Sequence, residues 1–345
     1  MENDSIGKRR LPVIGGVSAW PRNEWVSRVS LVSVVIPAFN AAAFIAESIR
    51  SACRQTYADL DIVVVDDGST DNTVQVLAAL AAQDRRIRLI KTDHRGVSAA
   101  RNRGIAEARG DVIATLDADD LWHPQKIERQ YDLLRRSETD VGVVYCWAAG
   151  IDAQGRVILP VWNASQAEGD VLSDIVRSGI LSNGSTPLMR RDAIERAGAY
   201  DETLQLCEDW QFYTALAGVC RFRAIPECLT GYRISDTSAS MDVLPMERAI
   251  ANVTAWIEAT WPDLPNEVLI DRARNVHRYL AFLAIRSGQY GLAARYIWHG
   301  INDGPRIKLN FQMIEMAALL LGHAVGIRQY RWQFWRTPQP FLQET

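Results

Sequence analysis

The chain has 345 residues, and its 38 lysines and arginines against 41 aspartates and glutamates give a formal charge of −3 at pH 7. A nearly neutral chain has no broad positive field for phosphates, so we expect no nucleic acid partner. Hydrophobic residues make up 48% and charged residues 23%, which is typical of globular proteins and excludes general disorder. The length predicts about two domains, or one domain with a large appendage.

The cysteines and the apolar segments restrict the cellular context. The five cysteines are scattered and none has the C-x-x-C spacing of a zinc or redox site, so we expect reduced, mostly structural thiols. Residues 11–20 contain two glycines and a proline, which is a poor apolar region for a signal peptide, and no run of 18 apolar residues occurs. We therefore expect neither secretion nor a membrane-spanning helix.

After an irregular leader at residues 1–30, apolar runs alternate with helix-like segments. The pattern predicts strands at 31–37, 61–65, 87–91 and 112–116, separated by helices at 41–51, 73–82 and 97–108. Strands that alternate with helices of this length are typical of parallel β-α-β units. We predict an α/β fold with a doubly wound, mostly parallel sheet flanked by helices.

Beyond this part the chain is less regular and then becomes helical. The next elements predicted are a helix at 121–136, a strand at 141–147 in a hairpin with 156–159, helices at 191–197 and 209–217, and a strand at 221–225. Strand signals stop near residue 240, and helices are predicted at 247–260, 267–287, 290–302 and 308–327. Residues 274–302 resemble one tetratricopeptide-like hairpin, but arrays of such repeats need about three, so a simple helical appendage is the favoured interpretation.

Polar residues follow the predicted strands, where ligands bind in open parallel sheets. The first strand ends in Pro37-Ala-Phe-Asn40, which lacks the glycines of a dinucleotide site or a P-loop. The ring of Phe39 and the amide of Asn40 could stack on and hydrogen-bond a nucleobase, although a helix-initiating turn explains them equally well.

The second strand ends in Asp66-Asp-Gly-Ser-Thr-Asp71, which contains helix-capping and turn residues. Because crowded carboxylates disfavour mutual ionisation, a ligand role for Asp67 is as well supported as a structural one.

The fourth predicted strand ends in Leu116-Asp-Ala-Asp-Asp120, which places three carboxylates at one edge of the sheet. A cation among them would relieve the repulsion, and Mg²⁺ or Mn²⁺ binds one or two carboxylates together with water and substrate phosphates. The alternative is a solvated acidic turn that caps the following helix.

Two more segments carry candidate site residues. Glu208-Asp-Trp210 opens a predicted helix, where carboxylates also interact favourably with the helix dipole. Arg101 and Asn102 lie near the start of another helix and could face an anionic phosphate, although surface arginines are common.

Taken in order, these segments resemble glycosyltransferase family 2, whose catalytic domain has the GT-A fold. The likeness is carried by residues 34–40, 65–71, 96–104, 116–120 and 208–210. It implies a GT-A catalytic domain at 31–240, between the leader at 1–30 and a helical C-terminal region at 241–345.

The resemblance also implies the roles of individual residues. The nucleotide would be bound by Pro37, Phe39, Asn40, Asp67, Gly96, Arg101, Asn102 and Asp117. In this assignment Phe39 packs on the base, Asp67 hydrogen-bonds it, and Asp117 lies near the ribose. Asp119 would be the ligand of Mn²⁺ or Mg²⁺, and Asp209 the general base, with Glu208 as the next candidate. Ser235 stands where family members often have a histidine near the metal, so the sequence identifies no second metal ligand.

The implied reaction is inverting transfer of one sugar from a nucleoside diphosphate sugar, with uridine favoured, to a hydroxyl of a saccharide or lipid-linked saccharide. Such a reaction would serve the synthesis of cell-surface polysaccharide or glycoconjugate. Gln329-Tyr-Arg-Trp332 is one residue shorter than the Gln-x-x-Arg-Trp of processive members, which favours a single addition. The alternatives are a degenerate transferase that acts as an assembly scaffold, and a metal-dependent phosphohydrolase that uses Asp117 and Asp119. The donor sugar, the acceptor and the linkage are not determined by the sequence.

Residues 308–336 mix apolar side chains with arginines and aromatic rings, a composition typical of membrane-interface segments. Packing of the tail against the catalytic domain explains the same composition. Because a lipid-linked acceptor would favour contact with lipid, we expect a cytoplasmic protein loosely attached to the inner face of a membrane.

Overall fold

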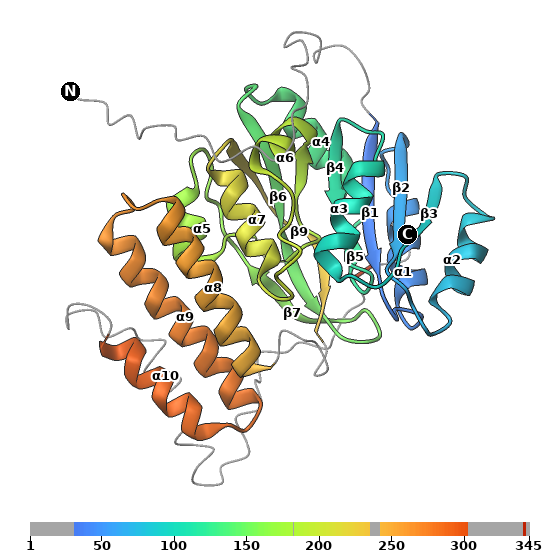
Figure 1. The fold of residues 1–345 in the computed structure, drawn as a ribbon. Helices are drawn as coiled ribbons and strands as arrows, with labels where there is room; N and C mark the ends of the chain where they lie inside the picture. The colour runs from blue at the N-terminus through green and yellow to red at the C-terminus, as the bar shows by residue number, and fades with distance from the viewer. Residues whose placement is uncertain (1–30, 182, 235–241, 303–340, 343–345) are drawn as a thin grey trace.

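The computed structural model describes residues 31–181, 183–234, 242–302 and 341–342 (Figure 1). The predictions for the leader at 1–30, for Ser235, for the helix at 308–327 and for the segment 308–336 therefore lie outside the described residues.

The described residues build one nine-stranded sheet with the order β3-β2-β1-β4-β8-β6-β9-β5, and β7 pairs with β6. The strands are β1 (Val32–Ala38), β2 (Leu60–Asp66), β3 (Ile87–Lys91), β4 (Val112–Thr115), β5 (Leu121–Trp122), β6 (Val141–Ile151), β7 (Val157–Asn163), β8 (Leu188–Arg190) and β9 (Arg221–Arg233). The helices are α1 (Ile45–Cys53), α2 (Thr73–Ala81), α3 (Val97–Glu107), α4 (Lys126–Arg136), α5 (Leu172–Ser178), α6 (Arg191–Ala197), α7 (Glu208–Ala217), α8 (Val243–Thr260), α9 (Asn266–Arg286) and α10 (Tyr290–Asn302).

The first four strands of this order, β3-β2-β1-β4, are parallel, which confirms the doubly wound arrangement. Every residue of β1 and β2 is buried, because helices cover both faces of the sheet. Alternate residues point to opposite layers: Val64 packs in the core that contains α1 and α2, whereas Val63 and Val65 pack against Ala100 of α3. Strands buried on both sides read as continuous apolar runs, and this is why the sequence located them.

The other half of the sheet is mixed. β8 is antiparallel to both β4 and β6, β9 runs parallel to β6, and β5 is antiparallel to β9. The predicted hairpin of β6 and β7 is confirmed. The predicted strand at 221–225 continues to Arg233, because its second half pairs with the end of β6.

One predicted element is wrong in its first part. The helix expected at 121–136 begins only at Lys126, since Leu121 and Trp122 pair with β9 as β5. Trp122 is fully buried there, and Pro124 separates the two elements. The sequence also missed α5 and β8, which at 7 and 3 residues are too short to show a clear period.

The C-terminal helices pack on one side of the sheet domain, beside α5 and α7 (Figure 1). Val176 of α5 shares a buried cluster with Val253 and Ile257 of α8 and Val268 of α9. α10 packs against α9, as the predicted hairpin requires. The helical region is thus joined to the sheet domain through an apolar interface.

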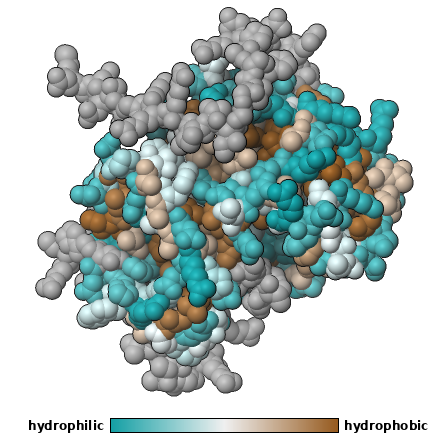
Figure 2. All heavy atoms as spheres, in the orientation of Figure 1, coloured by the Kyte–Doolittle hydropathy of each residue, from teal (hydrophilic) through white to brown (hydrophobic). Residues whose placement is uncertain are grey.

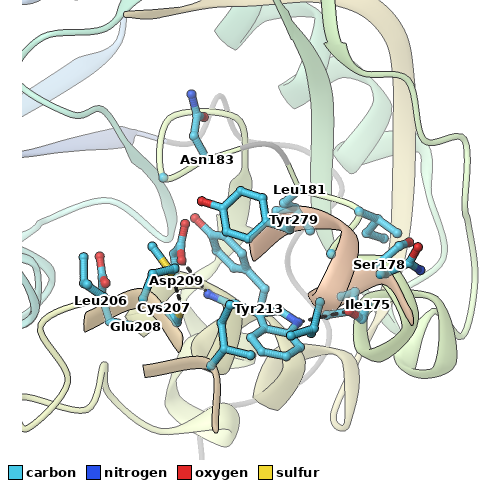
Figure 3. Close-up of a pocket in the computed structure, with 18 of the residues that line it drawn as sticks. Ile175, Ser178, Leu181, Asn183, Leu206, Cys207, Glu208, Asp209, Tyr213 and Tyr279 are labelled. Atoms are coloured by element: carbon cyan, nitrogen blue, oxygen red, sulfur yellow. Dashed lines mark hydrogen bonds between the residues drawn. The ribbon is translucent and has the colours of Figure 1, made fainter. Parts of the chain in front are cut away.

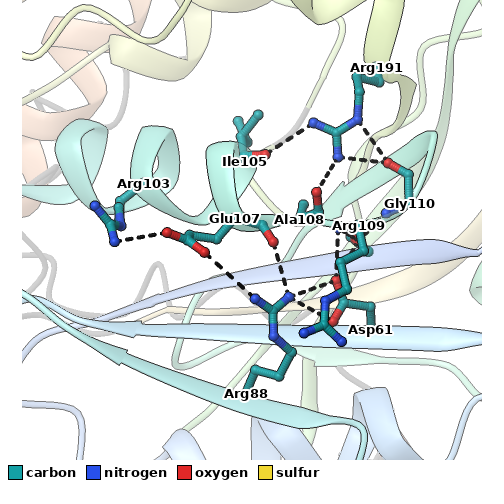
Figure 4. A network of polar contacts seen from close by, with 10 residues as sticks. Asp61, Arg88, Arg103, Ile105, Glu107, Ala108, Arg109, Gly110 and Arg191 are labelled. Atoms are coloured by element: carbon teal, nitrogen blue, oxygen red, sulfur yellow. Dashed lines mark hydrogen bonds and ion pairs between the residues drawn. The ribbon is translucent and has the colours of Figure 1, made fainter.

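A polar network joins the end of α3 to the sheet (Figure 4). The guanidinium of Arg191 donates hydrogen bonds to the carbonyl oxygens of Ile105, Ala108 and Gly110. Two of these carbonyls lie at or just past the helix end, where no helical N–H is left to bind them. Asp61 accepts from Arg88 and from the backbone N–H of Arg109 at 3.0 Å each, which holds β2, β3 and the start of β4 together.

The face of the molecule in Figure 2 is mostly polar, with apolar side chains in small separate groups. No described helix has the length and apolar character needed to cross a membrane. All five cysteines are free, as predicted.

Candidate active site

The loop after β1 carries Phe39 and Asn40. Phe39 is 44% exposed and stacks on His94 with ring centroids 3.9 Å apart, which leaves an aromatic surface open at the edge of the sheet. Asn40 has a φ of 48°, and its side-chain oxygen accepts hydrogen bonds from the N–H groups of Thr70 (2.9 Å) and Asp71 (3.3 Å). Asn40 therefore holds the loop after β2, and both residues are exposed.

Pro37 and Asn102 lie outside the open part of the site. Pro37 is buried within β1, opposite Val65 of β2. The side chain of Asn102 donates to the carbonyl oxygen of Tyr200 (2.9 Å) and accepts from its N–H (2.9 Å). Asn102 thus holds the segment before α7 and is not among the described residues that line the cavity.

Asp67 organises the loop that opens α3. Its carboxylate is 2% exposed and accepts hydrogen bonds from the N–H groups of Arg95 (3.0 Å) and Gly96 (2.8 Å), while His94 Nδ1 lies 2.9 Å away. Gly96 has a φ of 97°, a conformation that favours glycine. The carboxylate therefore also positions His94 against Phe39, a partner that the sequence did not reveal.

Arg101 links the end of β4 to the start of α7. This buried guanidinium donates to Asp117 Oδ1 and to Glu208 Oε1, each at 2.7 Å. Burial would lower its pKa, but the two carboxylates outweigh burial and raise it well above the usual value. Arg101 thus contacts carboxylates in this structure, where the sequence suggested a phosphate.

The three aspartates after β4 do not share one edge, which corrects the expectation of a common acidic cluster. Asp120 points into the interior, where it accepts hydrogen bonds from Ser185 Oγ (2.6 Å), Asn183 Nδ2 (3.1 Å) and the N–H of Arg233 (3.0 Å). Burial and the charge of Asp119 raise the pKa of Asp120. Asp120 is therefore a structural carboxyl that positions the loop before β8.

Asp117 and Asp119 remain as candidate metal ligands. Burial and the neighbouring charge of Asp117 raise the pKa of Asp119 to about 6, which is the repulsion that a cation would relieve. The described residues contain no group of three or more His, Cys, Asp or Glu side chains arranged to hold a metal. Two carboxylates completed by water and diphosphate oxygens are nevertheless a usual environment for Mg²⁺, so the pair fits the predicted cation.

Asp209 lies in the first turn of α7. Burial and the charge of Glu208 raise its pKa to about 7, although Arg101 opposes the shift. Glu208 forms the ion pair with Arg101, whereas no ion pair joins Asp209 to another described residue. Cys207, just before the helix, has a φ of 61° and so turns the chain sharply into α7. Glu208 thus faces Arg101, and the neighbouring Asp209 has a pKa suited to proton transfer near neutral pH.

A cavity of about 720 Å³ joins part of this site to the helical region (Figure 3), whereas Phe39, Asp67 and Asp119 are not among its lining residues. Asp117, Glu208 and Asp209 line one part of it, and α5, α8 and α9 line the other. Figure 3 shows Asp209 beside Tyr213 and Tyr279, two tyrosines whose pKa values burial raises, with a further contribution from the Asp209 charge. Tyr213 lies on α7, four residues after Asp209. Short-range sequence patterns could not reveal Tyr279, because α9 reaches the site only through tertiary packing.

The loop before β8 also approaches the cavity, which the sequence analysis did not predict. A Cβ atom on Gly184 would lie 2.7 Å from Asp117 Oδ2 and 2.8 Å from Arg101 Nη2. The glycine therefore allows the loop to pass directly over the ion pair.

Comparisons with known proteins agree with this architecture. The family described as "Glycosyl transferase family 2" matches residues 33–194. An uncharacterized glycosyltransferase of Rickettsia typhi is 28% identical over 274 residues, which cover 77% of this chain and 82% of that protein. Chondroitin synthase of Escherichia coli is 36% identical over 138 residues, which cover 40% of this chain but only 20% of the synthase.

Two solved structures share the fold. S. aureus TarS in complex with UDP has a TM-score of 0.56 at 17% identity, over 86% of this chain and 92% of that one. The mannosyltransferase PcManGT from Pyrobaculum calidifontis, in complex with GDP-Man and Mn²⁺, has a TM-score of 0.57 at 19% identity, over 88% of both chains.

The fold and the site thus define a glycosyltransferase with a GT-A type sheet. Residues 33–194 match glycosyl transferase family 2, which confirms the resemblance seen in the sequence motifs. This match argues against the phosphohydrolase alternative.

Proposed function

We propose that this enzyme transfers a single sugar from a nucleoside diphosphate sugar to a hydroxyl of a saccharide or lipid-linked saccharide, with inversion at the anomeric carbon. The observation that carries the proposal is Asp209, a carboxyl with a pKa of about 7 that lines the same cavity as Asp117. The solved structures with a similar fold bind UDP or GDP-Man, which supports a nucleoside diphosphate donor. A preference for uridine stays a prediction.

Each residue of the site would have a separate role in binding or catalysis. Phe39 and His94 offer an aromatic surface for the base, and Asp117 would bind the ribose. Asp119, with Asp117, would hold Mn²⁺ or Mg²⁺, which supplies neutralisation of the diphosphate charge. Asp209 removes the proton from the acceptor hydroxyl, and the oxygen then attacks the anomeric carbon opposite the departing diphosphate.

The Arg101 ion pair supports Asp209 over Glu208 as the base. Glu208 is held 2.7 Å from the guanidinium, so its carboxylate is already engaged in an ion pair. Arg101 and Glu208 are therefore positioning residues that fix the start of α7 next to Asp117.

The biosynthetic role of the reaction is proposed from similarity to known proteins. The likeness to a chondroitin synthase supports a role in the synthesis of polysaccharide or glycoconjugate. We propose that residues 31–240 form the catalytic domain and that the helical region from 241 completes the cavity. A cytoplasmic location and membrane contact through residues 308–336 stay predictions.

A binding and turnover assay of the full chain tests the proposal. UDP-sugars and GDP-sugars are screened for a rise in melting temperature with and without Mn²⁺, since a ligand bound only to the folded state stabilises it by mass action. Release of nucleotide from the stabilising donors is then measured. We expect cation-dependent binding and turnover. If a nucleotide sugar binds but is not turned over with any acceptor, the scaffold alternative is favoured. If no nucleotide sugar raises the melting temperature, the proposal is contradicted.

A further inference from the structure

Arg233 is a buried arginine at the end of β9, outside the residues to which a role in the reaction has been given. The residue is 2% exposed, and its guanidinium carbon lies 4.5 Å from the ring centroid of Phe44. Burial of an arginine is costly unless its N–H donors are bound. The partners of these donors therefore show which parts of the chain the side chain holds in place.

The guanidinium binds three backbone carbonyl oxygens and one carboxylate. Its Nε donates to the carbonyl oxygen of Asp119 at 2.7 Å, and its Nη1 donates to those of Asp152 and Ala153 at 2.8 Å each. Its Nη2 donates to Glu47 Oε2 at 2.8 Å. Arg233 thus joins the loop after β4 to the turn between β6 and β7 and to α1.

The two candidate metal ligands of the loop after β4 are held from different elements. The N–H of Asp117 donates to Ser185 Oγ at 2.9 Å, in the segment before β8. Arg233 of β9 instead holds the other end of the loop, since it binds the carbonyl oxygen of Asp119 and its own N–H donates to Asp120 Oδ1 at 3.0 Å. The backbone position of Asp119 therefore depends on Arg233.

A hydrogen bond at a carbonyl oxygen also affects the side chain of the same residue. The carbonyl carbon and Cβ are both bonded to Cα, so fixing the carbonyl group of Asp119 limits the directions in which its carboxylate can leave the backbone. A carboxylate that is already directed toward a cation binds it more tightly than one that must first be oriented.

We propose that Arg233 is a positioning residue for the cation: it binds the backbone of Asp119 and so directs the carboxylate toward the metal that Asp119 and Asp117 share. The planar guanidinium suits this role, because its fixed donors bind several oxygens in different directions at once, whereas an ammonium donates from a single nitrogen. The inference rests on the proposed function, in which Asp119 holds Mn²⁺ or Mg²⁺, and adds to it a residue that contacts neither the metal nor the nucleotide.

The test measures how strongly Mn²⁺ improves the binding of UDP to the full chain. Calorimetry gives the dissociation constant of UDP with Mn²⁺ and with EDTA, and the ratio of the two reports the contribution of the cation. Arg233→Gln should lower this ratio by about 10-fold or more, the usual effect of losing a group that orients a metal ligand, while the affinity in EDTA stays unchanged. Arg233→Lys keeps the charge and one donor, so it should lower the ratio less, and it decides the result if Arg233→Gln does not fold.

Arg190→Lys is the matched control. The Arg190 guanidinium also binds backbone carbonyl oxygens, those of Val141 at 2.9 Å and Leu134 at 3.0 Å, but these lie outside the loop after β4. Arg190→Lys should therefore lower the stability of the fold and leave the ratio unchanged. A purely structural effect reduces the number of UDP sites per chain, which calorimetry also reports, and not the affinity of each folded molecule.

The outcomes separate this inference from the proposed function. An unchanged ratio in the folded Arg233 variants, or an equal fall in Arg190→Lys, would overturn the positioning role. A fall in the EDTA affinity as large as the fall in the Mn²⁺ affinity would overturn it too, because Arg233 would then serve the nucleotide site as a whole. If Mn²⁺ does not improve UDP binding to the wild-type protein, the cation in the proposed function is itself contradicted, and the inference falls with it.

Discussion

Asp119 and Asp120 are adjacent, yet their surroundings give them different roles. Asp120 is enclosed by three hydrogen-bond donors, whereas Asp119 is partly buried beside another carboxylate. A carboxyl whose pKa is raised by folding lowers the stability of the folded state when it ionises. The ionised Asp119 therefore needs a compensating interaction. Cation binding is such an interaction.

Substitution of each aspartate by alanine should separate these roles. Asp119→Ala should abolish Mn²⁺-dependent nucleotide binding and turnover without lowering the free energy of unfolding. Asp120→Ala leaves buried donors on Ser185, Asn183 and Arg233 without a partner, and should lower the free energy of unfolding by about 2–4 kcal/mol. Urea denaturation and UDP titration with Mn²⁺ measure both effects. Equal loss of stability in the two variants would contradict the assignment.

The elevated pKa of Asp209 predicts a pH profile. The carboxyl is protonated and inactive as a base well below its pKa of about 7, so kcat/KM should rise with pH and level off above that value. Asp209→Asn should reduce transfer by about 10²-fold or more and remove this rise, with donor affinity unchanged. Steady-state kinetics from pH 5 to 9 check this. If Glu208→Gln removes the rise and Asp209→Asn does not, the base is Glu208.

At the scale of single elements, α4 contains a buried cation. Lys126 is fully buried, its Nζ donates to Gln130 Oε1 at 2.7 Å and lies 4.2 Å from the Trp122 ring centroid, and burial lowers its pKa to about 8. Between pH 8 and the pKa of an unfolded lysine, about 10.4, Lys126 holds its proton more fully in the unfolded chain than in the folded one. Lys126 therefore makes the free energy of unfolding rise with pH over this range.

Comparison with Lys126→Met isolates this contribution. From pH 8 to 10, the free energy of unfolding of the wild type relative to the variant should increase by up to about 3 kcal/mol. Urea denaturation at several pH values provides the measurement. A constant difference over this range would mean that Lys126 has an ordinary pKa in the folded protein.

The end of α3 allows a second test at this scale. Arg191→Met removes the donors to the three carbonyl oxygens of Figure 4 and should lower the free energy of unfolding by about 2–4 kcal/mol. Arg103→Met is the control, since it removes only a largely exposed ion pair with Glu107 on the same helix and should cost about 0.5 kcal/mol. Similar losses in both variants would show that the carbonyl contacts contribute little.

At the scale of the whole molecule, the helical region and the sheet domain share buried residues. Besides the cluster around Val176, Leu206, Cys207 and Trp210 pack against the core formed by α8, α9 and α10. Because neither part buries its apolar surface alone, we expect them to unfold together.

This coupling predicts one unfolding transition. Far-UV circular dichroism and tryptophan fluorescence should give coincident curves, and Val176→Ala should shift the entire transition to a lower temperature, with a loss of about 2 kcal/mol. Val161→Ala, at a position 39% exposed, is the control and should change little. Two separate transitions, with only one of them sensitive to Val176→Ala, would contradict the prediction.

The sequence alone predicted those parts that depend on local patterns. Strands β1, β2 and β4 were found because burial on both faces makes them continuous apolar runs, and their ends carry Phe39, Asp67, Asp117 and Asp119 in recognisable motifs. The family and the GT-A type fold followed from the order of these motifs.

Tertiary structure decided which of these side chains face one another. It turned Asp120 inward and Asn102 toward Tyr200, joined Arg101 to Glu208 across 107 positions, and brought α9 to the cavity. Charge repulsion, burial and hydrogen bonding depend on distances between atoms, and residues far apart in the chain become neighbours only when the sheet and the helices pack together. The sequence therefore determined the class of enzyme, and the packing of the helices determined the shape and charge of the cavity in which it works.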